Sequence, residues 1–312
     1  MSYEGVINLL KPAGMTSHDV VYFLRKLTKE KRIGHTGTLD PMAVGVLVLC
    51  IGSATRIIDY LDLDKKEYRC EILLGVETDT WDIWGNVIRD SRNKIKGITE
   101  ETIKEAFRPF MGEIFQIPPN YSAVRIGGKR LYEYARVGQE VEVPSRPVII
   151  YDLKFIGFDQ RTGRVLFDVT CSKGTYIRSI CHQVGLTLGC GGAMSFLARK
   201  ASGIFQIKDG ATIEELMINW QQYLLPMDVP LAQLGKLQIP SDRATWFCNG
   251  GSLRKEQATV ICHPSFIEIS KHIKRRKGLE KAYRVYYEDC FMGVVIYDEE
   301  RKLFVADKVF SK

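Results

Sequence analysis

The sequence has 312 residues, of which 45% are hydrophobic and 26% are charged, and this balance is typical of a folded globular chain. It excludes a disordered chain, a collagen and a small disulfide-stapled protein, and at about 150 residues per domain the length predicts two domains. The longest apolar run, residues 43–52, is about half as long as a membrane-spanning helix requires. The first residues lack a basic stretch ahead of an apolar core, so we expect no signal peptide and a cytoplasmic location.

Basic residues outnumber acidic ones by 44 to 37, which gives a formal net charge of +7. Seven of the basic residues lie in the window 271–284, and such a cluster suits a phosphate backbone, although a solvated surface loop has the same composition. Lys274, Arg275 and Arg276 of this window are candidate RNA-backbone contacts. The eight cysteines and five histidines lack the C-x2-C and H-x3-H spacings, so we expect buried thiols and no metal site.

Hydrophobic periodicity predicts mixed strands and helices up to about residue 225. Residues 4–10 are expected to form a strand, and Ser17 to cap a helix that runs to about residue 29. A glycine-containing loop over 34–41 follows. Further elements are expected, in order, at 44–51 (strand), 53–60 (helix capped by Ser53), 68–74 (strand), 99–108 (helix capped by Thr99), 148–158 and 165–171 (strands), 175–188 (helix opened by Thr175) and 212–225 (helix opened by Thr212). Since strands and helices do not alternate strictly, the pattern favours an α+β fold over a doubly wound sheet.

The pattern of predicted elements changes near Pro240, from mixed strands and helices to short strands. Pro226 and Pro230 begin a connector, and short strands separated by turns then follow to the end of the chain. They are expected at 259–262, 282–287, 291–297 and 303–309. This pattern predicts a small β-rich domain. We therefore expect one domain over 1–235 and a second over 240–312.

The common nucleotide and hydrolase motifs are missing. No G-x-G-x-x-G follows a strand, and Gly128-Lys129, which comes nearest to a phosphate-binding loop, is followed by Arg130. No G-x-S-x-G sequence occurs. Asp40 is the most informative acidic residue, because it lies in a loop with small neighbours that permit the close approach of a ligand. Its carboxylate could act as nucleophile or base, although Asp-Pro is also a common way to start a turn.

Residues 34–47, GHTGTLDPMAVGVL, resemble the G-H-x-G-x-L-D-P-x-A-x-G-x-L signature of the bacterial TruB-type tRNA pseudouridine synthases. Four more blocks are similar to motifs of this family in the same order. They are the lysine-proline motif at 8–17, the second motif at 66–85, the RNA-gripping insertion at 118–130 and the arginine motif at 171–178. The resemblance implies a pseudouridine synthase fold with a mixed central sheet, followed by a PUA-like RNA-binding domain whose similarity is weaker.

The resemblance implies a role for each matched position. Asp40 matches the catalytic aspartate, Arg178 the arginine paired with it, and Tyr68 the tyrosine that stacks on the target uracil. Four other matched positions are candidate substrate contacts. His35 corresponds to a histidine inserted into the RNA loop, Tyr176 and Leu197 correspond to the remaining uridine-pocket residues, and Lys11 corresponds to a lysine near the site.

The implied reaction converts uridine 55 in the T-loop of tRNA into pseudouridine. It breaks the N1–C1′ glycosidic bond and rejoins the base through C5, which involves no redox change, so we expect no cofactor. The uridine must be flipped out of the loop at a cost of a few kcal/mol, and stacking on an aromatic ring such as Tyr68 recovers about 1–3 kcal/mol. A guanidinium beside Asp40 would favour its anion.

The insertion is expected to bind RNA. It spans about residues 118–147, is rich in glycine and proline, and carries Arg125, Lys129 and Arg130 as candidate backbone contacts. We expect it to be mobile and to close on the RNA. Bound tRNA should then protect it from limited proteolysis, and equal protease sensitivity with and without tRNA would contradict this.

Other functions remain open from the sequence. The same fold could serve as the catalytic subunit of a guide-RNA-directed synthase, although the insertion argues against this, and activity on tRNA alone would separate the two. The chain could also be an RNA-folding chaperone with a retained pocket, in which case an Asp40→Asn protein should still promote folding. A hydrolase would release free uracil. We expect a monomer that binds tRNA and needs no protein partner or membrane.

Overall fold

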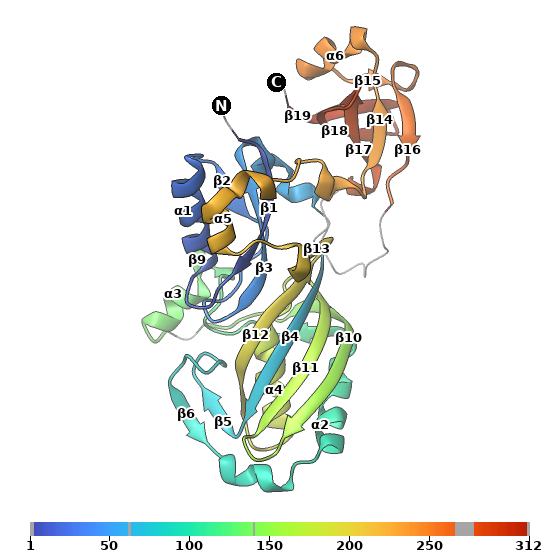
Figure 1. Ribbon diagram of the computed structural model, residues 1–312. Coiled ribbons are helices and arrows are strands. Elements are labelled where there is room, and N and C mark those ends of the chain that lie inside the picture. Colours follow the sequence, from blue (N-terminus) through green and yellow to red (C-terminus); the bar gives the residue numbers. More distant parts are fainter. Residues whose placement is uncertain (1–2, 62–63, 140, 266–277, 311–312) are drawn as a thin grey trace.

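Two β-sheets organise the computed structural model, which describes residues 3–61, 64–139, 141–265 and 278–310 (Figure 1). The strands of the larger sheet are β1 (Gly5–Lys11), β2 (Ile33–His35), β3 (Val44–Ile51), β4 (Lys65–Leu74), β7 (Gly112–Gln116), β10 (Arg146–Asp159), β11 (Arg164–Ser172), β12 (Gly192–Ser202) and β13 (Phe205–Gln206). Their order is β1-β3-β12-β4-β11-β10-β7, with β13 paired to β12 and β2 to β3. The expectation of an α+β fold is confirmed.

The larger sheet is mixed, because β12 runs parallel to β3 and antiparallel to β4. The parallel register pairs Ala198 with Val44 and Arg199 with Gly45. Gly45 has φ of +100°, and a Cβ added there would lie 2.3 Å from the Arg199 carbonyl oxygen, so the close approach of the two strands requires glycine. This pairing brings Arg199 beside the loop that contains Asp40.

Some helices begin at the N-cap residue expected from the sequence, and others begin at a different residue. The helices are α1 (Ser17–Thr28), α2 (Glu100–Phe107), α3 (Leu131–Arg136), α4 (Ile177–Thr187), α5 (Ile213–Asn219) and α6 (Ser241–Cys248). Thr99 and Thr212 cap α2 and α5 as predicted. The caps expected at Ser17 and Ser53 are wrong, since Thr16 caps α1, and Gly52–Tyr60 is a 3-10 helix without a side-chain cap. Thr175 lies outside α4, which begins after Tyr176.

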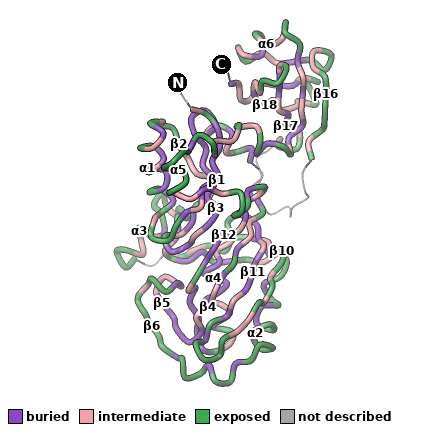
Figure 2. Tube along the Cα trace, in the orientation of Figure 1, coloured by how far each residue is buried: buried purple, intermediate pink, exposed green. Residues whose placement is uncertain are grey.

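Helices α2 and α4 cover one face of the larger sheet (Figure 1). Ile180 and Val184 of α4 are fully buried in one cluster with Ile72 of β4 and Phe167 of β11. Buried residues run along the central strands, whereas the outer turns are exposed (Figure 2). The start of α4, which carries Arg178, is therefore anchored to the strand that carries Tyr68.

The smaller sheet forms a β-rich C-terminal unit, as predicted. Its strands are β14 (Gly235–Gln238), β15 (Leu253–Arg254), β16 (Thr259–Cys262), β17 (Ala282–Tyr287), β18 (Cys290–Asp298) and β19 (Leu303–Val309), in the order β15-β19-β18-β17-β14-β16. A shared apolar cluster joins this unit to the larger sheet, with Val46 and Val48 on one side and Val294 and Phe310 on the other. The candidate contacts Lys274, Arg275 and Arg276 lie outside the described residues.

Two short hairpins complete the described chain. They are β5 (Val76–Thr78) with β6 (Val87–Asp90), and β8 (Arg125–Ile126) with β9 (Lys129–Arg130). The second hairpin and α3 both belong to the 118–147 insertion. No helix in the described part of the chain is long and apolar enough to cross a membrane.

Candidate active site

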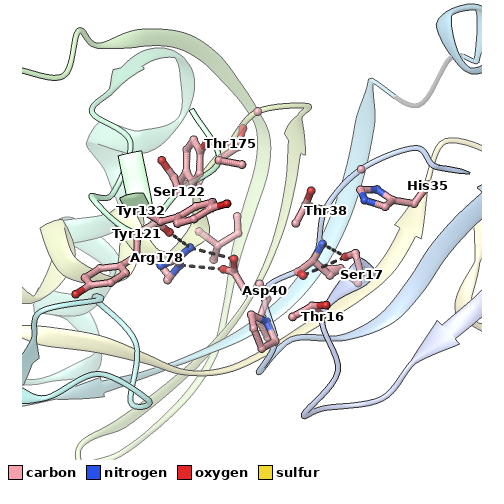
Figure 3. Close-up of a pocket in the computed structure, with 18 of the residues that line it drawn as sticks. Thr16, Ser17, His35, Thr38, Asp40, Tyr121, Ser122, Tyr132, Thr175 and Arg178 are labelled. Carbon is pink, nitrogen blue, oxygen red and sulfur yellow. Dashed lines mark hydrogen bonds and ion pairs between the residues drawn. The ribbon is translucent and has the colours of Figure 1, made fainter. Parts of the chain in front are cut away.

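A pocket of about 790 Å³ lies where the insertion meets the larger sheet, and this volume suits a nucleotide-sized ligand. Its lining residues come from the start of α1, the loop around Asp40, strands β4 and β12, the insertion and the start of α4. Figure 3 shows Asp40 and Arg178 joined at its centre, with Tyr132 and Thr175 on one side and Thr38 and His35 on the other. Residues far apart in the sequence therefore face one cavity.

Asp40 and Arg178 form a bidentate ion pair. Arg178 Nε lies 2.9 Å from Asp40 Oδ2, and Arg178 Nη2 donates to Asp40 Oδ1 at 3.0 Å. Arg178 is 5% exposed, whereas the Asp40 side chain is 31% exposed and lines the pocket. One charge-assisted hydrogen bond together with a second close ionic contact fixes the orientation of the carboxylate. The pair predicted from the sequence motif is thus present, with the carboxylate facing the cavity and the guanidinium behind it.

The Arg178 guanidinium has further partners, which hold it in place. Nη1 donates to the Thr80 carbonyl at 3.1 Å and lies 3.6 Å from Asp82 Oδ2, and Nη2 donates to the Tyr121 carbonyl at 3.1 Å. Burial raises the pKa of the Asp82 carboxyl, and the Arg178 charge opposes that rise. Asp82 lies in the second sequence motif, but sequence reasoning gave it no role.

Tyr68, Leu197 and Tyr176 form an apolar and aromatic wall of the pocket. Tyr68 of β4 is paired with Arg199 of β12, and Leu197 is paired with Cys70 two positions along the same ladder. Burial raises the pKa of both tyrosine hydroxyls, so both stay neutral at physiological pH. The Tyr176 backbone N–H donates to Gln116 Oε1 at 3.0 Å, which fixes the turn that leads into α4.

His35 also lines the pocket, away from Arg178 (Figure 3). Its Nδ1 is buried and has no hydrogen-bond partner among the described residues. Burial lowers the pKa of the imidazole, and the charge of Arg199 lowers it further. His35 is therefore neutral at physiological pH where its ring meets the pocket.

Lys11 occupies a structural position and is absent from the pocket lining. It is 1% exposed, and its Nζ donates to the carbonyls of Pro12 at 2.8 Å, Met15 at 2.7 Å and Pro41 at 3.2 Å. Burial lowers the pKa of this ammonium to about 8. These bonds tie the N-terminal motif to the loop beside Asp40, so the geometry favours a positioning role over the substrate contact expected from the sequence.

The insertion contributes pocket residues as well as surface charges. Arg130 and Tyr132 line the pocket, whereas Arg125 and Lys129 are exposed and do not. RNA contacts by the three basic residues, and closure of the insertion on RNA, stay predictions. The described residues contain no group of three or more His, Cys, Asp or Glu side chains placed to hold a metal ion.

Arg199 supports the Asp40 loop from beneath. It is 1% exposed, and its guanidinium donates to the carbonyls of Val46 at 2.6 Å, Gly37 at 3.1 Å and Thr38 at 3.4 Å. Sequence reasoning gave it no role in the site. The sequence carries little signal for this, because Arg199 is followed directly by another basic residue, Lys200, and local sequence does not tell which of the two is buried.

Replacing Arg199 with methionine is expected to lower the free energy of unfolding by about 2–4 kcal/mol, because buried carbonyls lose their donors. Lys200→Met is the matched control, since this neighbouring lysine is partly exposed and pairs with Asp168. It should cost less than about 1 kcal/mol. Urea denaturation measures both values, and equal losses would contradict the support assigned to Arg199.

Two family models together match residues 25–232. The first is described as the TruB family pseudouridylate synthase N-terminal domain and matches residues 25–177, and the second, the tRNA pseudouridylate synthase B C-terminal domain, matches residues 178–232. The chain is 49% identical over 252 residues to tRNA pseudouridine synthase B of Alkaliphilus oremlandii, which covers 80% of this chain and 83% of that relative. It is 42% identical over 295 residues to the protein of the same name from Clostridium kluyveri, covering 93% and 94%.

Solved structures are similar over almost the whole chain. A structure of an H/ACA ribonucleoprotein bound to a substrate RNA containing 2′-deoxyuridine matches with a TM-score of 0.69 and 25% identity, covering 99% of this chain and 85% of that one. A Cbf5-Nop10-Gar1 complex matches with a TM-score of 0.69 and 26% identity, covering 98% and 84%. The similarity therefore includes both sheets.

Proposed function

Since the chain belongs to the TruB family of pseudouridylate synthases, we propose that it acts on the uridine at position 55 in the T-loop of tRNA. Formation of pseudouridine in tRNA follows from relatives of that name at 42–49% identity over most of the chain. One observation supports this pocket as the active site: the Asp40 carboxylate is held by Arg178 in a pocket that Tyr68 and Leu197 also line.

The reaction breaks the N1–C1′ bond, turns the uracil and forms a C5–C1′ bond, after which the C5 proton leaves to solvent. Asp40 is the catalytic residue, because it is the carboxylate that lines the pocket and the bidentate contact with Arg178 aims it at the cavity. Tyr68 stacks on the flipped uracil, and Tyr176 and Leu197 enclose it. His35 lines the pocket as a neutral imidazole and contacts the RNA loop.

We also propose that the protein works without a guide RNA or a protein partner, as a cytoplasmic monomer. Sequence identity to the tRNA pseudouridine synthases B is 42–49%, whereas identity to the chains of the ribonucleoprotein structures is 25–26%. This difference favours activity without a guide RNA. The lining residues that the insertion supplies also favour direct recognition of tRNA. A chaperone role remains a separate question, which tRNA refolding by an Asp40→Asn protein would answer.

The test is tritium release from a T-stem-loop RNA labelled with 5-³H-uridine, with the wild-type protein alone. Release should reach one tritium per target uridine, and an RNA with cytidine at the target position should release none from that site. No release without an added guide RNA would favour the guided alternative. Free uracil among the products would indicate a hydrolase.

A further inference from the structure

Lys66 is a pocket residue that has no part in the proposed reaction. It lies on β4 two residues before Tyr68, and successive side chains of a strand point to opposite faces, so the two share one face of the sheet. Both line the pocket. Lys65, by contrast, is exposed and points to the other face.

The Lys66 ammonium has no acceptor among the described residues, although it is partly buried. A Cβ added at Gly37 would lie 2.9 Å from Lys66 Nζ and 3.8 Å from Arg199 Nη1, so the ammonium lies against the loop that carries Asp40. Asp64, the acidic group that raises its pKa, forms its own ion pair with Lys173 at 2.6 Å. The ammonium therefore faces the cavity as an uncompensated charge.

The surrounding charges leave this end of the pocket positive. Asp40 and Asp82 both lie against Arg178, and Arg199 is directed at backbone carbonyls. Burial and, to a smaller extent, the charge of Arg199 together lower the pKa of Lys66 to about 8. A desolvated cation without a counter-ion is costly, and an anionic group of the ligand would relieve that cost.

We propose that Lys66 binds a phosphodiester next to the target uridine while Tyr68 stacks on the base. The inference rests on the proposed function, since it assumes a flipped uridine in this pocket. Two residues of β-strand span about 7 Å, which is comparable to the separation of a base from its own backbone phosphate. One strand thus presents a stacking ring and a phosphate ligand at matching spacing. By holding the phosphate of the RNA backbone, Lys66 determines how deeply the nucleotide enters the pocket and how it is oriented.

The experiment compares three T-stem-loop RNAs under multiple turnover. One has only phosphodiesters, one carries a neutral methylphosphonate on the 5′ side of the target uridine, and one carries it on the 3′ side. They are assayed with wild type, Lys66→Gln, Lys66→Arg and the control Lys65→Gln. On the all-phosphodiester RNA, Lys66→Gln should raise KM by about 10- to 100-fold with kcat changed less than about threefold, because it loses a charge-assisted hydrogen bond. Lys66→Arg should recover most of the loss, and Lys65→Gln should behave as wild type.

The modified RNAs identify the phosphate. One of the two methylphosphonate RNAs should raise the wild-type KM to the value that Lys66→Gln has on the all-phosphodiester RNA. On that modified RNA, wild type and Lys66→Gln should have the same KM. A Lys66→Gln penalty of the same size on all three RNAs would overturn the proposal and indicate a structural role. If the wild-type protein fails to release tritium from the all-phosphodiester RNA, the proposed function itself fails.

Discussion

Replacing Asp40 with asparagine should abolish tritium release from the labelled T-stem-loop, with a loss in kcat of more than about 10³-fold. Asparagine has the shape of aspartate and can still accept a hydrogen bond from Arg178, but its amide cannot carry the negative charge that the chemistry at C1′ or the base requires. Arg178 keeps the Thr80 and Tyr121 carbonyls and the Asp82 carboxylate as partners. The variant should therefore fold and should bind RNA.

Asp82→Asn is the matched control for Asp40. It removes a second carboxylate that faces the same guanidinium, at 3.6 Å instead of 2.9 Å, but Asp82 does not line the pocket. Its loss in kcat should be clearly smaller than that of Asp40→Asn. Tritium release and filter binding of the same RNA check both variants. An Asp40→Asn rate within tenfold of wild type, or equal losses for the two variants, would remove Asp40 from the catalytic position.

The sequence supported the fold class because periodicity reports which face of an element is buried, and most of the expected strands and helices are present. The central strand β12 was not expected, and the helix expected over 212–225 ends at Asn219. It was less reliable at helix starts, because a hydroxyl can have a tertiary partner. Ser17 was expected to cap α1, yet its Oγ donates to the Leu39 carbonyl and accepts from the Leu39 N–H, so Thr16 caps the helix. A contact across 22 positions in the chain cannot be read from local sequence.

The same reason separates the site residues that were predicted from those that were missed. Family resemblance pointed to Asp40 and Arg178, which lie 138 positions apart and meet in the structure. Lys11 and Arg199 are basic residues near matched motifs. From composition alone, such residues would be predicted to bind nucleic acid. Their observed partners are backbone carbonyls, so their charge is used inside the protein. Whether a basic residue faces RNA or the interior depends on which loops the fold brings to it.

Replacing Arg178 with methionine should lower the free energy of unfolding by about 3–5 kcal/mol at neutral pH and reduce kcat by more than about 10³-fold. The variant leaves Asp82 buried without its cation and releases Asp40 from its bidentate contact. Arg178→Lys should recover part of the stability but little of the activity, because a compact ammonium cannot form the fork that orients the carboxylate. Urea denaturation and tritium release measure the two effects, and wild-type activity in Arg178→Lys would contradict the orienting role.

The stability loss in Arg178→Met should also depend on pH. Burial already raises the pKa of Asp82 above its ordinary value of 3.8, and Arg178 is the main group that opposes the rise. Without the arginine this pKa should rise further, so the folded variant takes up a proton at a pH where the unfolded chain remains ionised. The folded state is then favoured as the pH falls, and the deficit relative to wild type should be smaller at pH 5 than at pH 8. A deficit that is constant over this range would indicate lost packing and contradict the unpaired charge. A smaller deficit at pH 8 after Asp82→Leu is added, with little change at pH 5, would support the unpaired charge.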